Sequence, residues 1–350
     1  ANKEAMTISP EVSAAPPSLS ALDDVHAFWA QRWAGPKLGW HKEDVNPHLA
    51  KYTNLLLGID SNESESKDKT TNNKNAKVLE EEGGARIFVP LCGKSVDLAY
   101  LASHPQISHV VGIDIVRNAA EDFASDHQFE FSVEEVVQAP QQQQHDNECK
   151  VVDTEGDEGK RCKNNANLSR QPTTMTSYHN GKGLTILIGD LFDFLSMNNT
   201  DRVKYMVAKG MHSSSATTKT TSSSSSSSAL PPAEYLFDTI YDRASMVAIK
   251  PNLRNDYVTL MGELLRPGGV ILLVSLDRRN TMSVVAKEDG PPFSIDEGEV
   301  RRLYESQEWV ESVTLLEEVN DLNSDKDRER WEKKGVLELY EMVFLIRKKR

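Results

Sequence analysis

Two residues at the ends of predicted strands have the spacing of a nucleoside-binding site. Gly93 lies in the turn after the apolar run 86–91, and Asp114 closes the next apolar run, 21 residues further on. A glycine in the first turn lets the backbone approach a ligand closely, and an acidic residue about 20 residues later accepts hydrogen bonds from ribose hydroxyls. The pair predicts an adenosine site. The alternative is an ordinary turn at Gly93 and a helix-capping aspartate at Asp114.

Asp190 and Leu191 follow a third apolar run, residues 184–188. At this position an aspartate can accept a hydrogen bond from the adenine amino group, while a leucine lies against the ring. Capping of a helix by Asp190 or Asp193 is an equally good interpretation.

Arg243 stands with Asp242 at the end of a fourth predicted strand, residues 237–241. A guanidinium facing a cleft requires an anionic partner, because an unpaired buried charge is costly. A carboxylate of the cofactor or an anionic substrate would supply that partner. The alternatives are a structural contact between Asp242 and Arg243 or an unrelated surface pair.

Trp29 and Trp33 are four residues apart, so that a helix would place both rings on one face. The loop that follows carries Trp40 and His41. Aromatic faces attract cations such as a sulfonium, so this helix could cover both ligands. A stripe of core residues is the simpler interpretation.

Composition excludes several classes of protein. The net charge is −13, and the one dense basic run, residues 347–350, is predicted to be a solvated tail, so we expect no nucleic-acid partner. Three scattered cysteines, of which Cys92 is predicted to be packed, give no disulfide or metal-binding pattern and favour a reducing, cytoplasmic location. No run of apolar residues is long enough to span a membrane, so we expect no membrane partner. We also expect a monomer without a bound metal.

Low-complexity composition divides the chain. Residues 1–20 are predicted to be a disordered tail, and three stretches near 60–77, 138–181 and 198–232 are predicted to be disordered insertions, because they cannot bury enough apolar surface. The remaining sequence within 21–350 is predicted to form one domain.

Helical and strand patterns alternate in that domain. We expect a mostly parallel sheet with helices on both faces, and an antiparallel edge from the last two strands, between which no helix is needed. The predicted helices are 22–33, 96–103, 118–125, 255–265 and 295–304, and the predicted strands are 86–91, 110–115, 184–188, 237–241, 270–275, 310–317 and 338–346.

Six stretches of the chain resemble the thiopurine S-methyltransferase family, particularly its bacterial members, and they occur in the family's order. They are Phe28-Trp-Ala-Gln-Arg-Trp33, Gly39-Trp-His-Lys-Glu-Asp-Val-Asn-Pro47, Val89-Pro-Leu-Cys-Gly-Lys-Ser95, Val111-Gly-Ile-Asp114, Tyr241-Asp-Arg243 and Gly290-Pro-Pro-Phe293. The family commonly has Glu at position 114 and Phe at position 40, and long insertions are not typical of it.

The resemblance implies a class I methyltransferase, Rossmann-like fold with a helical lid. It assigns eight residues to S-adenosylmethionine, namely Trp29, Trp33, Leu91, Gly93, Asp114, Asp190, Leu191 and Arg243. It places Trp40, Pro291 and Phe293 near the methyl acceptor, and we expect His41, the neighbour of Trp40, to bind the acceptor with them. It implies methylation of a small-molecule thiol, in detoxification, with Arg243 as the catalytic residue that favours the thiolate.

Other functions stay open on the sequence. A related halide, hydrosulfide, selenium or tellurium methyltransferase would differ only in its acceptor. A nicotinamide-dependent oxidoreductase is also an α/β protein, but this chain lacks a Gly-x-Gly-x-x-Gly turn. A nucleic-acid amino-methyltransferase would carry an Asn/Asp-Pro-Pro-aromatic motif where Asp242-Arg-Ala stands. A cofactor-binding interaction protein is the non-enzyme alternative.

Overall fold

The computed structural model describes residues 22–35, 41–59, 83–137, 174–181, 183–196, 236–322 and 324–350. The chain divides into two units, residues 1–38 and 39–350. In the first, the described element is α1 (Leu22–Trp33), a helix over the predicted range. The single domain over residues 21–350 stays a prediction. The predicted tail 1–20 and insertions 60–77 and 198–232 lie outside the described residues.

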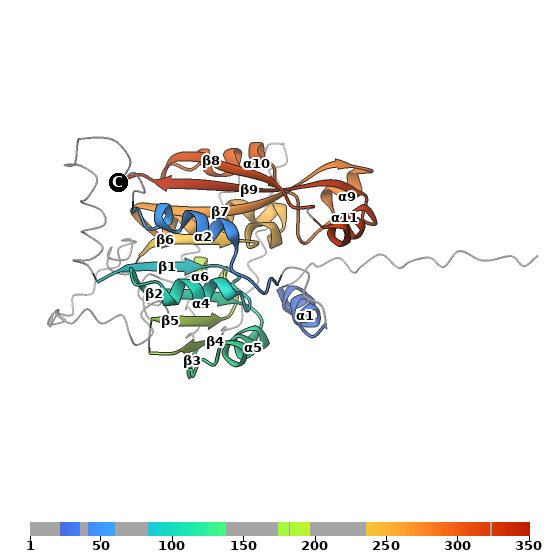
Figure 1. The fold of residues 1–350 in the computed structure, drawn as a ribbon. Coiled ribbons are helices and arrows are strands. Elements are labelled where there is room, and N and C mark those ends of the chain that lie inside the picture. Colours follow the sequence, from blue (N-terminus) through green and yellow to red (C-terminus); the bar gives the residue numbers. More distant parts are fainter. Residues whose placement is uncertain are drawn as a thin grey trace, which may run out of the picture. The chain divides into compact units, whose positions relative to one another are not determined.

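The second unit contains a nine-stranded sheet in the order β3-β4-β5-β2-β1-β6-β7-β9-β8 (Figure 1). The five central strands, β5 to β7 in that order, are parallel to one another, and the two strands on each side are antiparallel. The bounds are β1 (Ala85–Val89), β2 (Ile107–Asp114), β3 (Ser132–Val137), β4 (Thr174–His179), β5 (Leu184–Ile188), β6 (Phe237–Arg243), β7 (Leu265–Thr281), β8 (Val310–Asn320) and β9 (Val336–Lys348). The predicted fold class is confirmed.

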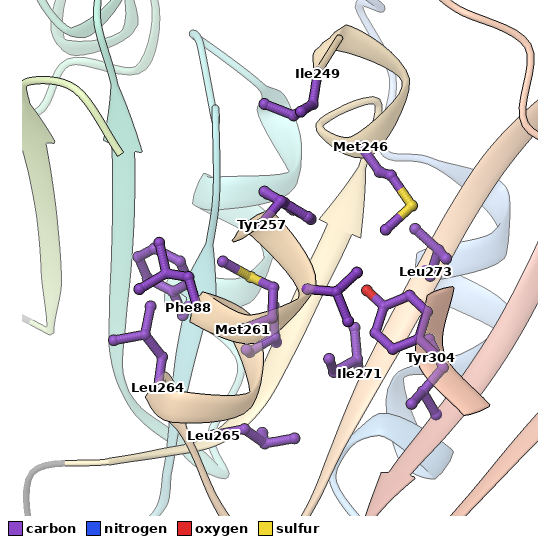
Figure 2. Close-up of a cluster of buried hydrophobic side chains, with 14 of the residues drawn as sticks. Phe88, Met246, Ile249, Tyr257, Met261, Leu264, Leu265, Ile271, Leu273 and Tyr304 are labelled. Carbon is purple, nitrogen blue, oxygen red and sulfur yellow. The ribbon is translucent and has the colours of Figure 1, made fainter. Parts of the chain in front are cut away.

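Helices cover both faces of this sheet because each has one apolar side. On one face, α2 (Pro47–Leu56), α4 (Val96–Ser103) and α5 (Arg117–His127) bury residues such as Leu49, Leu98 and Phe123. On the other face lie α6 (Asp193–Ser196), the 3-10 turns η2 (Met246–Ala248) and η3 (Pro251–Leu253), α8 (Arg254–Leu264) and α10 (Glu297–Glu305). Figure 2 shows part of this second core, where Tyr257 and Met261 of α8 pack beside Phe88 and Ile271.

Two sequence predictions about these elements were wrong, and a third was right only in part. Strand β4 lies inside the insertion predicted at 138–181 and pairs with both β3 and β5, because Met175 and Tyr178 supply buried side chains. The last two strands are antiparallel as expected, but helix α11 (Asp325–Glu332) lies between them in the sequence. In the basic run 347–350, Arg347, Lys349 and Arg350 are exposed as predicted, whereas the Lys348 ammonium donates to the carbonyls of Gly262 and Leu265.

Strand β7 continues beyond the carboxyl end of β6. Arg243, the last residue of β6, pairs with Val274, whereas β7 runs on to Thr281 and stays paired with β9. This extension carries α9 (Val284–Glu288) after it and packs with α11 around Trp331 and Leu339. Among the described helices none is both long and apolar enough to cross a membrane.

Gly262 of α8 has no room for a side chain. A Cβ built there would lie 2.3 Å from Nε1 of Trp309. We expect Gly262→Ala to lower the free energy of unfolding by about 1–3 kcal/mol, although alanine favours helices, because the ring must move within a packed core. Urea denaturation would measure it. The double variant with Trp309→Leu should recover part of the loss, and an unchanged or raised stability of Gly262→Ala would contradict the packing.

Candidate functional site

Four adjacent parallel strands bring the predicted cofactor residues to one edge of the sheet. In the order β5, β2, β1 and β6, the carboxyl ends of these strands lead to Asp190, Asp114, Gly93 and Arg243, respectively. Open parallel sheets bind ligands at this edge, because the helices on the two faces leave a crevice there. The four residues that the sequence analysis placed at or after strand ends therefore lie along one edge of the sheet.

Asp114 joins two of these strand ends directly. Its Oδ2 accepts a hydrogen bond from the backbone N–H of Gly93 at 2.9 Å, and its Oδ1 accepts from the N–H of Val116 at 2.9 Å. Gly93 has φ 51°, a left-handed conformation that suits glycine. Desolvation of the buried carboxyl raises the pKa of Asp114 to about 6, although its backbone donors act in the opposite direction. Asp114 thus shapes the turn whatever ligand it holds.

The turn around Gly93 is held on its other sides as well. The N–H of Cys92 donates to the carbonyl of Ile113 at 2.9 Å, and the hydroxyl of Ser245 donates to the carbonyl of Pro90 at 2.6 Å. Leu91 has φ 41°, which is rare for a residue with a Cβ. Cys92 is buried as predicted, and burial raises the pKa of its thiol well above the ordinary value.

The turn after β5 lies against Asp114, since the N–H of Gly189 donates to the carbonyl of Asp114 at 2.9 Å. Asp190 is partly exposed, and its Oδ1 accepts from the N–H of Phe192 at 2.9 Å, so it holds the local turn. Leu191 is 2% exposed and packs in the core with Phe194. Its predicted contact with adenine stays a prediction.

Arg243 is partly exposed at the end of β6, and its guanidinium makes no salt bridge to any residue that the structure describes. The alternative contact with Asp242 is absent, because Asp242 is fully buried and its Oδ2 accepts from the Tyr257 hydroxyl at 2.7 Å. The pKa of Glu341 is lowered. Desolvation acts to raise it, but a hydrogen bond from His48 and the charge of Arg243 lower it by more.

Glu341 and His48 are site residues that the sequence did not reveal. Val274 of β7 pairs with Arg243 of β6 on one side and with Val343 of β9 on the other. Because β9 runs antiparallel to β7, Glu341 lies two residues beyond the level of Arg243, opposite Leu276. The Oε2 of Glu341 lies 3.3 Å from Nε2 of His48, and Oε2 of Glu317 lies 3.3 Å from Nδ1 of the same ring. A glutamate within the apolar run 339–346 was the one sequence feature that could have indicated it.

The start of α2 is fixed beside this cluster by Asp97. Its Oδ1 accepts from the N–H of Asn46 at 2.8 Å, and its Oδ2 accepts from the Tyr241 hydroxyl at 3.0 Å. Asn46 in turn caps α2 by accepting from the N–H groups of His48 and Leu49. His48 is therefore held at a fixed position between the helix and the strands.

We expect His48→Gln to lower the free energy of unfolding by about 1–3 kcal/mol, because it removes the charged partner of two half-buried carboxylates. Hydrogen bonding to Glu341 raises the pKa of His48 and lowers that of Glu341. The His48 contribution is full below its unfolded pKa near 6.5 and is lost as the pH rises through its folded pKa. The Glu341 contribution is lost as the pH falls below 4.5 through its own folded pKa.

Denaturation of wild type and variant at pH 4 to 9 would measure this dependence. The difference between them should be largest from about pH 4.5 to 6.5. Lys333→Gln, which changes an exposed pair within α11 and the turn after it, provides the control. A difference that does not change with pH would contradict the ion-pair account.

The predicted acceptor residues fall into three groups. His41 is partly exposed, and burial, Lys94 and Arg243 lower its pKa, which places it near both the cofactor turn and β6. Pro291 and Phe293 lie in the loop after α9, and the N–H of Phe293 donates to the carbonyl of Val247 at 2.6 Å, four residues after Arg243. Trp40 lies outside the described residues, and Trp29 and Trp33 belong to α1 in the other unit.

The chemistry of this edge fits an adenosyl ligand with a charged amino-acid end. The oxygens of Asp114 accept backbone hydrogen bonds from Gly93 and Val116, and a carboxylate has enough acceptor sites to take a ribose hydroxyl as well. Asp190 offers a second partly exposed carboxylate, and Arg243 is a cation suited to a ligand carboxylate or thiolate. In the described residues no cluster of His, Cys, Asp or Glu could hold a metal ion.

Comparison with known proteins gives consistent matches. The sequence model of the family described as thiopurine S-methyltransferase (TPMT) matches residues 68–153 and 203–349. The thiopurine S-methyltransferase of Vibrio atlanticus (strain LGP32) is 27% identical over 319 residues, covering 91% of this chain and 96% of the relative. A probable thiopurine S-methyltransferase of Yarrowia lipolytica is 26% identical and covers 84% and 89%, respectively.

Solved structures also resemble the chain. The phosphoethanolamine N-methyltransferase 2 of Haemonchus contortus in complex with S-adenosyl-L-methionine has a TM-score of 0.40 and 13% identity, covering 79% of this chain and 53% of that one. The N-methyltransferase NodS of Bradyrhizobium japonicum has a TM-score of 0.35 and 10% identity, covering 81% and 100%.

Proposed function

Because the chain belongs to the thiopurine S-methyltransferase family, and is thus an S-adenosylmethionine-dependent methyltransferase, we propose that it methylates the sulfur of a small-molecule thiol. Aromatic, aliphatic and thiopurine-like thiols are the acceptors in this proposal. The family assignment replaces the nicotinamide-dependent oxidoreductase and the non-enzyme interaction protein that the sequence left open.

The observation that carries the acceptor class is the position of Arg243. It is a cation at the ligand edge of the sheet without a salt bridge to any described residue. A thiol must lose its proton to become a good nucleophile, and a nearby guanidinium favours the thiolate. The Phe293 ring in the loop tied to Val247 suits a soft, apolar acceptor.

The cofactor supplies a methyl group that is already activated by its sulfonium sulfur. The residues of the chain then need only bind, orient and exclude water. In this proposal Asp114 and Asp190 accept hydrogen bonds from the adenosine part, with Leu91, Gly93 and Leu191 beside it, and Arg243 holds the acceptor anion. The assignments of Trp29 and Trp33 to the cofactor and of Trp40 to the acceptor stay predictions from the sequence, and in this proposal His41, Pro291 and Phe293 border the acceptor.

A cytoplasmic location belongs to the same proposal. It is supported by Cys92, a buried free thiol that is compatible with reducing conditions. A monomeric state and a role in detoxification are likewise proposed.

An acceptor screen tests the proposal. The purified full chain is titrated with S-adenosylmethionine by calorimetry and then incubated with benzenethiol, 6-mercaptopurine, 2-mercaptoethanol, hydrosulfide, iodide, phenol and aniline. Mass spectrometry measures S-adenosylhomocysteine and the methylated product. We expect the organic thiols to react fastest, with rates that rise with pH through each thiol pKa and then level off. Methylation of phenol or aniline with thiols inert would refute the proposal, and iodide or hydrosulfide as the best acceptor would favour the related enzymes.

A further inference from the structure

The loop over residues 290–293 is tied at its carboxyl-terminal end to the turn η2 and to strand β7. The N–H of Phe293 donates to the carbonyl of Val247 at 2.6 Å, and the N–H of Ile295 donates to the carbonyl of Leu276 at 2.8 Å. The loop enters from α9, beyond the edge where the parallel strands end (Figure 1). Its path between α9 and Ile295 must therefore be set by other contacts.

Arg278 of β7 supplies those contacts. Its side chain is inside the loop and the residue is 2% exposed. One guanidinium nitrogen, Nη1, donates to the carbonyls of Ala286, at 3.0 Å, and of Asp289. The other, Nη2, donates to the carbonyl of Pro292 at 2.5 Å. Three carbonyl groups on both sides of Gly290 thus converge on one planar cation.

Burying the Arg278 guanidinium costs free energy, and a simple turn does not need a buried cation. Burial lowers the pKa of Arg278, and the guanidinium makes no salt bridge to a carboxylate within the described residues. A buried cation is tolerated when fixed dipoles replace its water, so the carbonyls must keep their positions. The cation is bounded on another side by Trp331 of α11, whose ring centroid lies 5.1 Å from its Cζ.

Asp277 reinforces the same loop from the neighbouring position. Its Oδ1 accepts from Nζ of Lys287 at 2.7 Å and from Oγ of Ser294 at 3.0 Å, and the residue is 3% exposed. Oγ of Ser294 also accepts from the backbone N–H of Arg278 at 2.9 Å. Asp277 and Arg278, two consecutive residues of β7, thereby hold Lys287 before the loop and Ser294 after it.

We propose that Arg278 is a positioning residue of the acceptor site. It sets the path of residues 290–293, and through that path it determines the affinity for the acceptor, whereas cofactor binding does not depend on it. The inference rests on the proposed function, which assigns Pro291 and Phe293 to the acceptor. Arg278 lies on the extension of β7 beyond Val274, away from the Gly93 and Asp114 turns, which explains the separation of the two effects.

The test compares Arg278→Gln with Arg278→Lys and with the exposed control Arg302→Gln on α10. We expect Arg278→Gln to raise the KM for benzenethiol by about tenfold or more, with a smaller change in kcat. The Kd of S-adenosylmethionine, measured by calorimetry, should stay within about twofold of wild type in each variant. Arg278→Lys should recover little, because an ammonium cannot donate to three carbonyls in one plane. Arg302→Gln should behave as wild type.

Hydrogen exchange of residues 284–294 gives a readout besides activity. Exchange should accelerate in Arg278→Gln and not in Arg302→Gln, while the protein still binds S-adenosylmethionine. An unchanged KM in a variant that binds the cofactor would overturn the inference, as would unchanged exchange. If wild type methylates no thiol, the proposed function fails by itself, and the exchange comparison still decides whether Arg278 positions the loop.

Discussion

Replacing Arg243 with Met should lower kcat/KM for benzenethiol by about 100-fold or more, which corresponds to about 2.7 kcal/mol of lost transition-state stabilisation. The guanidinium makes no salt bridge to a described residue, so the variant removes a charge that the fold itself does not use for pairing. Loss of the cation should also shift the midpoint of the pH–rate profile upwards, because the bound thiol loses the charge that favours its ionised form.

Steady-state kinetics with the acceptor varied at several pH values would measure both effects. Arg243→Lys keeps the charge but not the planar fork, and we expect it to remain well below wild type. Arg302→Met, on the exposed side of α10, is the control for loss of an arginine. Wild-type activity in Arg243→Met would remove this residue from the mechanism and leave the acceptor class without its main support.

Asp114→Asn should weaken S-adenosylmethionine binding by about 1–3 kcal/mol, which is roughly 5- to 150-fold in Kd. Asparagine has one acceptor oxygen, whereas both carboxylate oxygens of Asp114 accept backbone hydrogen bonds, from Gly93 and Val116. The variant should therefore loosen the turn as well as lose a ribose acceptor, and its melting temperature should fall. Calorimetric titration with the cofactor would measure the affinity.

The pH dependence of that affinity has a definite sign. Desolvation raises the pKa of Asp114 from 3.8 to about 6, so the carboxyl takes up a proton as the pH falls through about 6. A protonated carboxyl accepts fewer hydrogen bonds, and the wild-type affinity should therefore decline below this pH. Since the folded pKa is raised, the same group favours the folded state less as the pH rises from about 3.8 to 6.

Two variants test whether the effect belongs to Asp114. Asp126→Asn removes an exposed carboxylate of α5 that pairs with Lys94, the residue after Gly93. This variant should leave the Kd of S-adenosylmethionine within about twofold of wild type. Asp114→Glu, the residue common in the family at this position, should retain more affinity than Asp114→Asn. Equal cofactor affinity in folded Asp114→Asn and wild type would contradict the assignment.

The sequence alone determined the parallel core and the edge at which the ligand residues meet. Apolar runs that end in Gly93, Asp114, Asp190 and Arg243 are local patterns, and the carboxyl ends of parallel strands share an edge by geometry. Burial of both faces explains why short apolar strands alternating with helices predicted this sheet correctly. Strand β4 was missed because it follows a long polar stretch and carries Thr and Ser at half its positions.

Only the tertiary structure decided how charged residues distant in sequence share the site. His48 and Glu341 are nearly 300 residues apart, and they meet because α2 packs across the face on which β9 exposes that glutamate. Arg278 belongs to a polar stretch of the sequence, yet the extension of β7 buries it under the loop that follows. Local sequence patterns record which face of an element is apolar, but the pairing of buried charges depends on which elements come together in space.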